Sequence, residues 1–333
     1  MERLIHEYLS GLKLGRKQSY RNLTVFALLS DYALDLDYLT LDEALSGNLI
    51  DVVEKDRDGT VPELKVVNKS DRMVLILDGE ELVGAKQNRI VNTTILIAGN
   101  STTVIPVSCV EQGRWSYRSD KFSSEMRLMA STLRAHKADQ VKYSLKNRGN
   151  FRSNQGEIWN EISAKAFRMA AESPSMAMSE IYRKEAPSLQ KYIKHFDLSD
   201  SQVGAVFMIN GKVAGMDCFG KAETFSKVFE KLVESYALDA IDSSGRDRAK
   251  AKKGSKNDAA KFLEASADCR VETHKSVGQG TDCRLDSDQS TGFALAHEDR
   301  VLHTSLFSRA AENNRRIPGS RMIRFSHRRR RRF

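Results

Sequence analysis

The stretch Met73-Val-Leu-Ile-Leu-Asp-Gly-Glu-Glu-Leu-Val-Gly-Ala-Lys-Gln-Asn-Arg-Ile-Val-Asn92 carries a dense polar run that directly follows an apolar segment. Its opening residues are aliphatic and favour a strand. The pair Asp78-Gly79 follows at once, and such a pair supplies the positive φ angles of a tight hairpin turn. Downstream, Gly99-Asn100 separates Ile95–Ala98 from Thr103–Val107, which predicts a second hairpin.

Short apolar strands separated by turn residues continue from Leu64 to Val110, at intervals of about 8 to 12 residues. This spacing is typical of an antiparallel β-sandwich or of a barrel-like sheet. The clearest hairpin lies further on, where Asn210-Gly211 separates Val203–Ile209 from Lys212–Met216. Asn-Gly between two apolar runs is the strongest short-range signal for a hairpin.

Helical patterns occupy the middle of the chain. Ser123–Lys146 is helical in pattern, and Asn154 with Glu157 three residues later fits a capping box. Ala222–Ile241 is the best helix, because its apolar residues follow the i, i+3, i+4, i+7 rule. Its charged residues fall outside that apolar face, namely Lys227, Glu230, Lys231 and Glu234. A helix followed by a loop is expected in residues 1–20.

The segregation of strands and helices along the chain predicts an α+β fold with an antiparallel β-sandwich or barrel-like core and a helical insert. The final strands, Phe293–Ala296 and Arg300–Phe307, could close the sheet that the early strands open. We therefore expect a single α+β domain over residues 1–308. The helical insert would span about 123–196, a basic stretch 245–261, and a basic disordered tail 309–333.

The positive charge of the chain is concentrated in that tail. The formal net charge is +9, and nine arginines with no acidic residue lie between Asn313 and Phe333. The tail thus accounts for the whole net charge. It could bind nucleic acid or an acidic membrane electrostatically, but it has few interleaved aromatic residues, so only non-specific binding is expected.

The composition suits a globular protein with a sizeable core, since 40% of the residues are hydrophobic and 29% are charged. No run approaches the roughly 18 apolar residues of a membrane-spanning helix, and the first residues lack the pattern of a signal peptide. We therefore expect a cytoplasmic protein with no membrane span. The cysteines lack the paired spacing of zinc ligands and are expected to be free thiols: Cys109, Cys218, Cys269 and Cys283.

The polar run and the segment Pro106-Val-Ser-Cys-Val-Glu-Gln-Gly-Arg-Trp115 are the polar signature of the chain. If the strands between them pair as a hairpin, the two segments meet at one edge of a sheet. Carboxylates could then act as general bases or as metal ligands. Cationic side chains could hold a phosphate, and an aromatic ring could stack on a base. The candidate catalytic residues are Glu80, Glu81 and Glu111, and the candidate ligand-binding residues are Lys86, Gln87, Asn88, Arg89, Arg114 and Trp115. The competing interpretation is a set of cross-strand ion pairs. No metal-ligand set is predicted.

Three further features are weaker candidates. Asp217-Cys-Phe-Gly220 precedes the best helix, so it either receives an anion at the helix N-terminus or supplies a capping Asp and a buried Cys. His303 lies in a strand-like run and is predicted to be a hydrogen-bonded sheet histidine rather than a catalytic one. Gly278-Gln-Gly280 is too short for a nucleotide-binding fingerprint.

Residues 78–89 and 107–115 are similar to the hallmark segments of a bacterial and archaeal family, the ARG and rhodanese-phosphatase-superfamily-associated protein domain. The similarity continues through Ile209–Lys212, Met216–Phe219 and Val301–Phe307 and would cover about residues 10–308. The resemblance implies association with ADP-ribosylglycohydrolase and rhodanese-phosphatase partners, and hence a role near ADP-ribose or NAD-derived chemistry. It implies no catalytic residues and no cofactor.

Three functions remain open from the sequence. The first is an accessory or binding domain that recognises a small nucleotide-like anion or a partner protein. The second is a hydrolase of a nucleotide-derived substrate, in which a glutamate acts as base and an arginine stabilises developing negative charge. The third is nucleic-acid binding through the arginine-rich tail.

Overall fold

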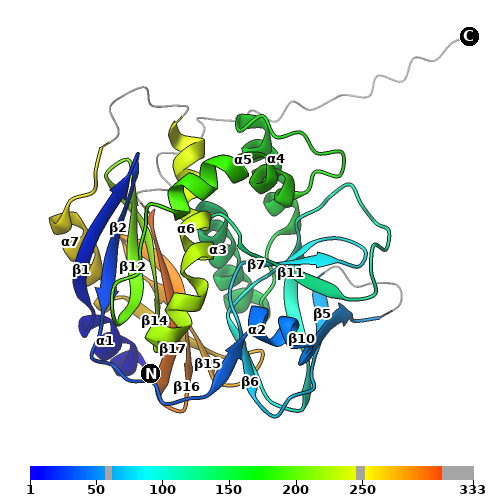
Figure 1. The fold of residues 1–333 in the computed structure, drawn as a ribbon. Helices are drawn as coiled ribbons and strands as arrows, with labels where there is room; N and C mark the ends of the chain where they lie inside the picture. Colours follow the sequence, from blue (N-terminus) through cyan, green and yellow to red (C-terminus); the bar gives the residue numbers. More distant parts are fainter. Residues whose placement is uncertain (57–61, 245–251, 310–333) are drawn as a thin grey trace, which may run out of the picture.

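The computed structural model describes residues 1–56, 62–244 and 252–309, and these form an α+β protein with large antiparallel sheets (Figure 1). Helix and strand are almost equally abundant, at 33% and 36%, which confirms the predicted fold class. The arginine-rich tail and most of the expected disordered segment lie outside the described residues. None of the helices in the described ranges has the length and apolar character needed to cross a membrane.

An eight-stranded antiparallel sheet forms one side of the molecule (Figure 1). Its strands, in spatial order, are β1 Lys13–Tyr20, β2 Leu23–Leu29, β12 Gln202–Ile209, β13 Lys212–Phe219, β17 Arg300–Ser308, β16 Ser290–His297, β15 Thr281–Asp286 and β14 Arg270–Lys275. The sheet contains both the first strands of the chain and the last ones, as predicted, and β12 and β13 lie between them. The hairpin at Asn210-Gly211 is confirmed, with φ of 52° and 78° at the two turn residues.

Helices cover both faces of this sheet. Helix α6 (Ala222–Ser244) packs on one face, and α1 (Glu2–Ser10) and α7 (Lys256–Ala267) pack on the other. Phe207 of β12 stacks on Tyr236 of α6, with ring centroids 3.9 Å apart, whereas Val206 faces Ile5 and Phe262. Because both faces are covered, β12 is apolar along its whole length instead of alternating.

A six-stranded sheet on the other side curls into a half-barrel and bears the candidate site. Its order is β11 Phe122–Leu128, β7 Glu80–Gly84, β8 Arg89–Val91, β10 Ser101–Cys109, β5 Glu63–Asn68 and β4 Ile50–Glu54. A small sheet lies next to it, formed by β3 Tyr38–Thr40, β6 Met73–Ile76 and β9 Ile95–Ile97. Their shared apolar core is distinct from those of the large sheet. This half-barrel is the barrel-like part of the predicted architecture.

The predicted hairpins at Asp78-Gly79 and Gly99-Asn100 are wrong. Strand β6 pairs with β3 and β9, while β7 pairs with β8 and β11, so the turn at Asp78-Gly79 carries the chain from the small sheet to the half-barrel. The turn does have the expected positive φ, 80° at Gly79. Likewise β9 pairs with β6, and β10 pairs with β5 and β8. Gly79 and Asn100 both have the positive φ of turn residues, at 80° and 48°, but a turn does not determine which strands pair.

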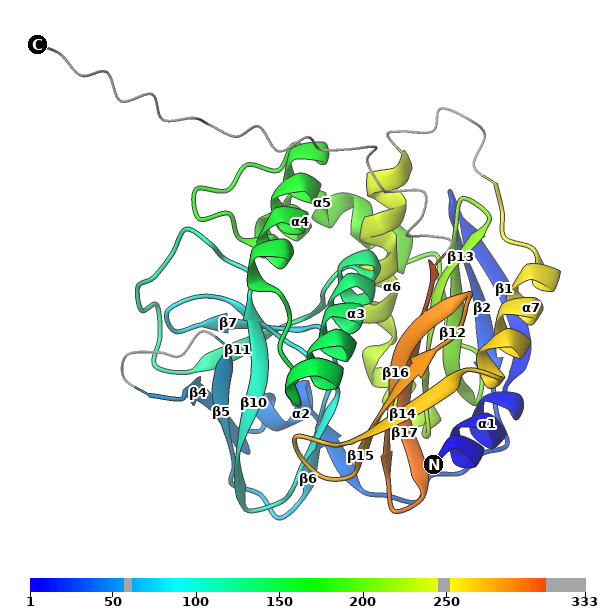
Figure 2. The same cartoon turned by 180° about the vertical axis from the view of Figure 1, so that it is seen from behind.

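The remaining helices are α2 Leu41–Ser46, α3 Ser131–Arg148, α4 Gln155–Arg168 and α5 Met178–Ile193. Asn154 caps α4 as predicted, because its side chain accepts the N–H of Glu157. Two predicted elements are corrected. The first part of the predicted helix Ser123–Lys146 is strand β11, an edge strand held by pairing with β7, and the loop expected before residue 20 is strand β1. Both views show α3 and α6 between the large sheet and the half-barrel (Figures 1 and 2).

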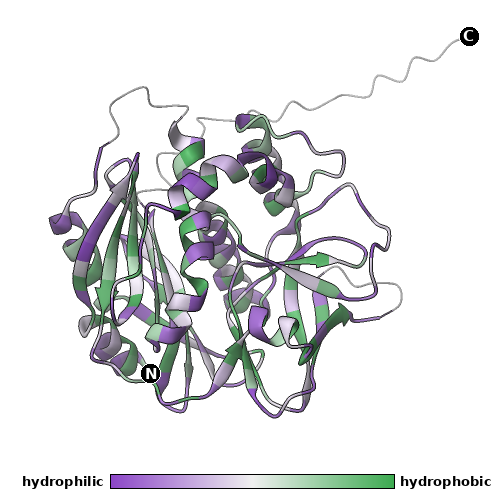
Figure 3. Ribbon diagram, in the orientation of Figure 1, coloured by the Kyte–Doolittle hydropathy of each residue, from purple (hydrophilic) through white to green (hydrophobic). Residues whose placement is uncertain are grey.

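Hydropathy follows this arrangement (Figure 3). The sheet interiors are apolar, whereas the outer strand β1 is largely hydrophilic. All four cysteines are buried and free, as the sequence predicted.

Candidate functional site

The two polar segments of the sequence meet at the end of strands β8 and β10. Cys109 of β10 is the sheet partner of Arg89, and the N–H of Val110 donates to the carbonyl of Asn88 at 3.0 Å. Glu111 then accepts the N–H of Asn88 at 3.2 Å. The expected meeting of the segments therefore occurs, although through pairing of β8 with β10 rather than through a hairpin at Gly99-Asn100.

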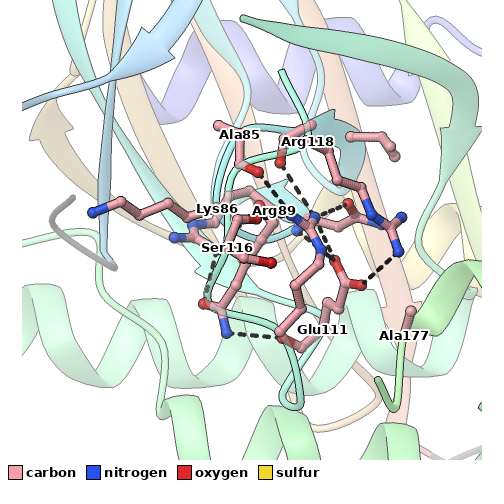
Figure 4. A network of polar contacts seen from close by, with 12 residues as sticks. Ala85, Lys86, Arg89, Glu111, Ser116, Arg118 and Ala177 are labelled. Atoms are coloured by element: carbon pink, nitrogen blue, oxygen red, sulfur yellow. Dashed lines mark hydrogen bonds and ion pairs between the residues drawn. The ribbon is translucent and has the colours of Figure 1, made fainter. Parts of the chain in front are cut away.

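Arg114 and Glu111 form the centre of this network (Figure 4). Arg114 donates from Nε and Nη2 to Glu111 Oε2 at 2.9 and 2.6 Å. Its nitrogens also donate to the carbonyls of Gly84, Ala85 and Ser116 at 2.7 to 3.3 Å, and to Asn88 Oδ1 at 3.1 Å. Arg114 thus clamps the β7–β8 turn.

The electrostatics of Glu111 follow from this clamp. Burial alone would raise the pKa of Glu111, but hydrogen bonds, chiefly from Arg114, outweigh it and lower the pKa below its ordinary value. Arg118 lies nearby, with Nη2 3.8 Å from Glu111 Oε1. Glu111 is therefore an ionised carboxylate. Its Oε2 accepts hydrogen bonds from Arg114 and Asn88, and its Oε1 has no hydrogen-bond partner among the described residues.

Arg89 is fully buried and only partly hydrogen-bonded. Its Nη1 donates to the carbonyl and to Oε1 of Gln87, at 3.2 and 3.1 Å. Its Nε and Nη2 have no hydrogen-bond partner among the described residues, and the nearest acid, Glu54, has Oε1 4.0 Å from Nη2. Burial lowers the pKa of Arg89. Burying a charged donor without an acceptor costs folding free energy, so the unpaired Nε and Nη2 of Arg89 need an explanation.

Aromatic and cationic side chains cover Arg89 from outside. The ring centroid of Trp115 lies 5.9 Å from Arg89 Cζ and 5.3 Å from Lys86 Nζ. The ring centroid of Tyr117 lies 5.2 Å from the same Lys86 Nζ. Both rings are about half exposed, 49% for Trp115 and 53% for Tyr117. Figure 4 shows Lys86 pointing away from the Glu111 carboxylate, so it extends the cationic rim outward.

Sequence reasoning missed three members of this site. The Cys109 thiol donates to Gln87 Oε1 at 3.1 Å, and burial raises its pKa, so it is a neutral donor. Glu54 reaches the site from β4, and Tyr117 from the loop after Trp115. Glu54 and Cys109 end strands that border the site, but no sequence signal indicates which strands are neighbours.

Glu80 lies apart from the cluster around Arg114 and Glu111. It also points to the opposite face of β7 from its neighbour Glu81, because successive residues of a strand alternate between the two faces of the sheet. Its carboxylate pairs with Lys231 of α6 and accepts the N–H of Leu77 at 2.9 Å. Lys231 also holds Asp42 at 2.7 Å. Lys231 is buried, which corrects its predicted place outside the apolar face of α6. Burial raises the pKa of Glu80 despite this ion pair.

Glu81 is buried, and neither of its carboxylate oxygens has a hydrogen-bond partner among the described residues. The nearest cation is Arg127, whose Nη1 lies 3.9 Å from Oε2. Arg127 is shared with Glu125 and Glu234 at 3.6 and 3.4 Å. Burial, reinforced by these other acids, raises the pKa of Glu81 to about 8. Glu81 is therefore neutral at pH 7, in contrast to Glu111.

Asp217 and His303 belong to a second buried network that joins the two halves of the fold. Arg134 of α3 donates to both oxygens of Asp217, at 2.7 and 3.2 Å, and pairs with Asp78 at 3.3 Å. Burial would raise the pKa of Asp217, but Arg134 lowers it well below its ordinary value. Asp217 is therefore engaged by Arg134 in the interior of the fold.

His303 is a hydrogen-bonded sheet histidine, as predicted. Its Nδ1 lies 2.9 Å from Thr94 Oγ1 and its Nε2 lies 3.2 Å from Ser305 Oγ. Burial lowers the pKa of His303. Ser305 donates directly to Asp217, so this set lacks the Asp–His–Ser order of a nucleophilic triad.

Gly278 and Gly280 serve close packing. A Cβ at Gly278 would lie 2.1 Å from the carbonyl oxygen of Leu96, and one at Gly280 would lie 2.1 Å from that of Ala296. Among the residues that the structure describes, no group of histidine, cysteine and acidic side chains is arranged to hold a metal ion.

The fold and the site together define a class: an α+β protein in which a half-barrel presents a buried arginine–carboxylate network at the ends of two strands. The chain belongs to the ARG and Rhodanese-Phosphatase-superfamily-associated Protein domain family, whose family model matches residues 11–307. This match confirms the resemblance seen in the sequence and nearly the same span. No curated protein and no solved structure matches the chain.

Proposed function

We propose that this chain is an accessory domain that binds a small anion at Arg89, beneath Trp115 and Lys86. The observation that carries the proposal is the buried Nε–Nη2 edge of Arg89, which has no acceptor among the described residues. That edge is the one through which arginine holds a carboxylate or phosphate with two parallel hydrogen bonds. An anion with two oxygens would satisfy both nitrogens.

Other arginines of the chain show that the Nε–Nη2 edge is the one that holds carboxylates in this protein. Arg72, Arg168 and Arg284 each hold an aspartate through Nε and Nη2, at 2.6 to 3.0 Å. Arg114 holds Glu111 in the same way. Arg89 is buried as deeply as Arg284, yet its closest acid, Glu54, stays 4.0 Å away. Glu54 is thus the internal competitor of an incoming anion.

The rim favours an anion that carries a flat ring. Trp115 and Tyr117 are half exposed, and Lys86 Nζ lies 5.3 and 5.2 Å from their ring centroids. Indole and phenol faces stack on a base, and the lysine adds positive charge beside them. We therefore propose a nucleotide-like ligand, with ADP-ribose or an NAD-derived molecule as the class that the sequence resemblance implies. Gln87, Asn88 and Arg114 would act indirectly, because they hold the turn that presents Arg89.

A binding panel tests this proposal on the full chain with inorganic phosphate, AMP, ADP-ribose and NAD. At a ligand concentration one hundred times the dissociation constant, binding should stabilise the protein by about 2.7 kcal/mol. Arg89→Gln should abolish the shift. Arg72→Gln is the matched control, because it removes an arginine with the same edge engaged at the surface.

A second measurement distinguishes loss of binding from unfolding of the Arg89→Gln variant. The chain has two tryptophans, so Trp159→Phe leaves Trp115 as the sole indole reporter. Ligand should change Trp115 fluorescence, and ADP-ribose should do so at lower concentration than phosphate. Retained binding in a folded Arg89→Gln variant would overturn the proposal.

A hydrolase is the second candidate, and one observation favours it. Glu81 and Glu111 have pKa values shifted in opposite directions, upward to about 8 by burial and downward by Arg114. Such a split is what a general acid and a general base require. Under this alternative the panel would show consumption of a ligand, and Glu111→Gln and Glu81→Gln would each remove turnover while the fold is kept. Binding without turnover would leave the accessory domain as the function.

A further inference from the structure

Three chain segments that are distant in the sequence meet at one end of the eight-stranded sheet. They are the β1–β2 turn, the β12–β13 turn and the residues before α7. The N–H of Asn210 donates to the carbonyl of Asn22 at 2.9 Å, and the N–H of Gly254 donates to Thr24 Oγ1 at 3.0 Å. A Cβ added at Gly211 would lie 3.1 Å from Cβ of Lys252. The three segments are therefore in direct contact.

Each of these segments presents exposed cations. The first turn carries Arg21, the second carries Lys212, and the third carries Lys252 and Lys253. The C-terminal end of α5 adds the exposed Lys194. These five residues are called the basic surface below.

Helix α5 is fixed beside the β1–β2 turn by Tyr192, whose hydroxyl donates to Asn22 Oδ1 at 2.9 Å. Lys194 follows Tyr192 by two residues at the end of that helix. The side chains of the basic surface therefore come from four segments held together by hydrogen bonds and packing, so the surface is preorganised.

Within the described residues, none of the five cations of the basic surface pairs with an acidic side chain. Some exposed lysines elsewhere are paired, such as Lys13 with Asp31 at 2.5 Å and Lys69 with Asp51 at 3.1 Å. Of the acids near the basic surface, Asp242 is already held by Lys165 and Arg168. The surface thus gathers positive charge that no acidic side chain of the described residues neutralises.

Stacked rings border the basic surface. Tyr20 and His195 stack with ring centroids 3.8 Å apart and an interplanar angle of 24°. Arg21 lies over the Tyr20 ring, with Cζ 5.4 Å from its centroid. The His195 side chain is exposed, so a further flat ring can extend this stack from the solvent side.

We propose that the basic surface binds single-stranded nucleic acid, with its cations on the phosphates and a base on the Tyr20–His195 stack. Cations that line a path beside an aromatic platform are the recurring design for single strands. A membrane surface would use the same cations but offers no ring to stack, and a duplex keeps its bases inside the helix. This surface is separate from the anion site at Arg89, and the proposal stands independently of it.

Anisotropy of a labelled single-stranded oligothymidylate, titrated with the full chain, tests the proposal. The test variant is Arg21→Gln with Lys212→Gln, Lys252→Gln and Lys253→Gln. The matched control removes four exposed cations from other surfaces, namely Lys146→Gln, Arg148→Gln, Lys275→Gln and Arg300→Gln. Both variants keep the arginine-rich tail, so its contribution is common to all samples.

Each lost phosphate contact should reduce the slope of log affinity against log salt by about 0.7, so the test variant should lose up to about 3 in slope. The control should keep the slope of the parent. His195→Ala should weaken oligonucleotide binding without changing the slope, because stacking releases no counterions. Melting temperatures should stay close to the parent value, since all substituted side chains are exposed.

Two outcomes would overturn the proposal. Equal losses in the test and control variants would mean that binding follows net charge alone. Binding of anionic vesicles that depends on the basic surface, together with oligonucleotide binding that does not, would assign the surface to a membrane.

Discussion

Replacing Glu81 with glutamine should raise the stability of the protein relative to the parent by an amount that grows as pH rises from about 5 to about 7. Glu81 is fully buried, lacks hydrogen-bond partners for both oxygens among the described residues, and has its nearest cation 3.9 Å away. Burial raises the pKa of Glu81 to about 8 from its ordinary value of 4.5. Between these two values the folded chain retains a proton that the unfolded chain has lost. The free energy of unfolding therefore falls as pH rises through this window, and it levels off above the folded pKa.

The size of the effect follows from the same shift. One pKa unit corresponds to about 1.4 kcal/mol, so the folded state is penalised by about 3 kcal/mol near pH 7 and by less than about 1 kcal/mol near pH 5. Glutamine has almost the same shape and no charge, so it removes the penalty. Its amide is buried as well, and an unsatisfied amide costs about 1 to 3 kcal/mol at every pH. The diagnostic quantity is therefore the change in stabilisation between the two pH values, about 2 to 3 kcal/mol.

Urea unfolding of the parent and of Glu81→Gln at both pH values measures this quantity. Glu80→Gln is the matched control, because Glu80 is the adjacent buried acid but is paired with Lys231. The control should destabilise at both pH values, since it leaves Lys231 with Asp42 alone. A difference between parent and Glu81→Gln that is the same at both pH values would refute the reasoning, because Glu81 would then be ionised or exposed in the folded state.

Three further predictions follow from the networks. Glu54→Gln should tighten anion binding at Arg89 about tenfold or more in isothermal titration, because it removes the competing carboxylate 4.0 Å from Nη2; unchanged or weaker binding would contradict this. Arg114→Lys should lower the melting temperature and cost about 2 kcal/mol or more, because one ammonium cannot replace contacts from Nε, Nη1 and Nη2; an unchanged melting curve would contradict the clamp. Arg134→Met should cost about 3 to 5 kcal/mol in urea unfolding, because it leaves the buried carboxylate of Asp217 without its cation; a loss below about 1 kcal/mol would show that water reaches that carboxylate.

Much of the fold could be predicted where a local pattern decides the structure. The Asn210-Gly211 hairpin and the helix beginning at Ala222 follow from turn chemistry and from apolar periodicity. Strands β1 and β14 could not be predicted this way. They are edge strands with many charged residues, Lys13–Tyr20 and Arg270–Lys275, and they exist because a neighbouring strand supplies hydrogen-bond partners. Such long-range pairing leaves no periodic trace in a short exposed segment.

The sequence could predict that the two polar segments of the candidate site lie together. It could not predict how deeply their side chains are buried or which partners they bond. Arg89 and Glu111 lie together as expected, although both are buried and most of their neighbours bond to one another. Glu80 and Glu81 follow each other in the sequence and yet serve different networks, because β7 turns them to opposite faces. Lys231 is a second example. Its charge predicts a solvent-exposed side chain, whereas the side chain is buried and pairs with Glu80 and Asp42.

The buried charges of this chain fall into two groups, and the difference directs the functional interpretation. In the first group the protein supplies both charges of a buried ion pair. The examples are Arg134 with Asp217 and Arg114 with Glu111. Arg134 also connects α3, the Asp78 turn and the large sheet, and we propose on this basis that residues 1–308 form one domain. Arg89 is different, because two buried donors on its binding edge lack an acceptor inside the described protein. A closed ion pair is accounted for by the stability it gives the fold. For Arg89, whose open donors lie at a strand end near half-exposed aromatic rings, we propose that a ligand supplies the missing oxygens.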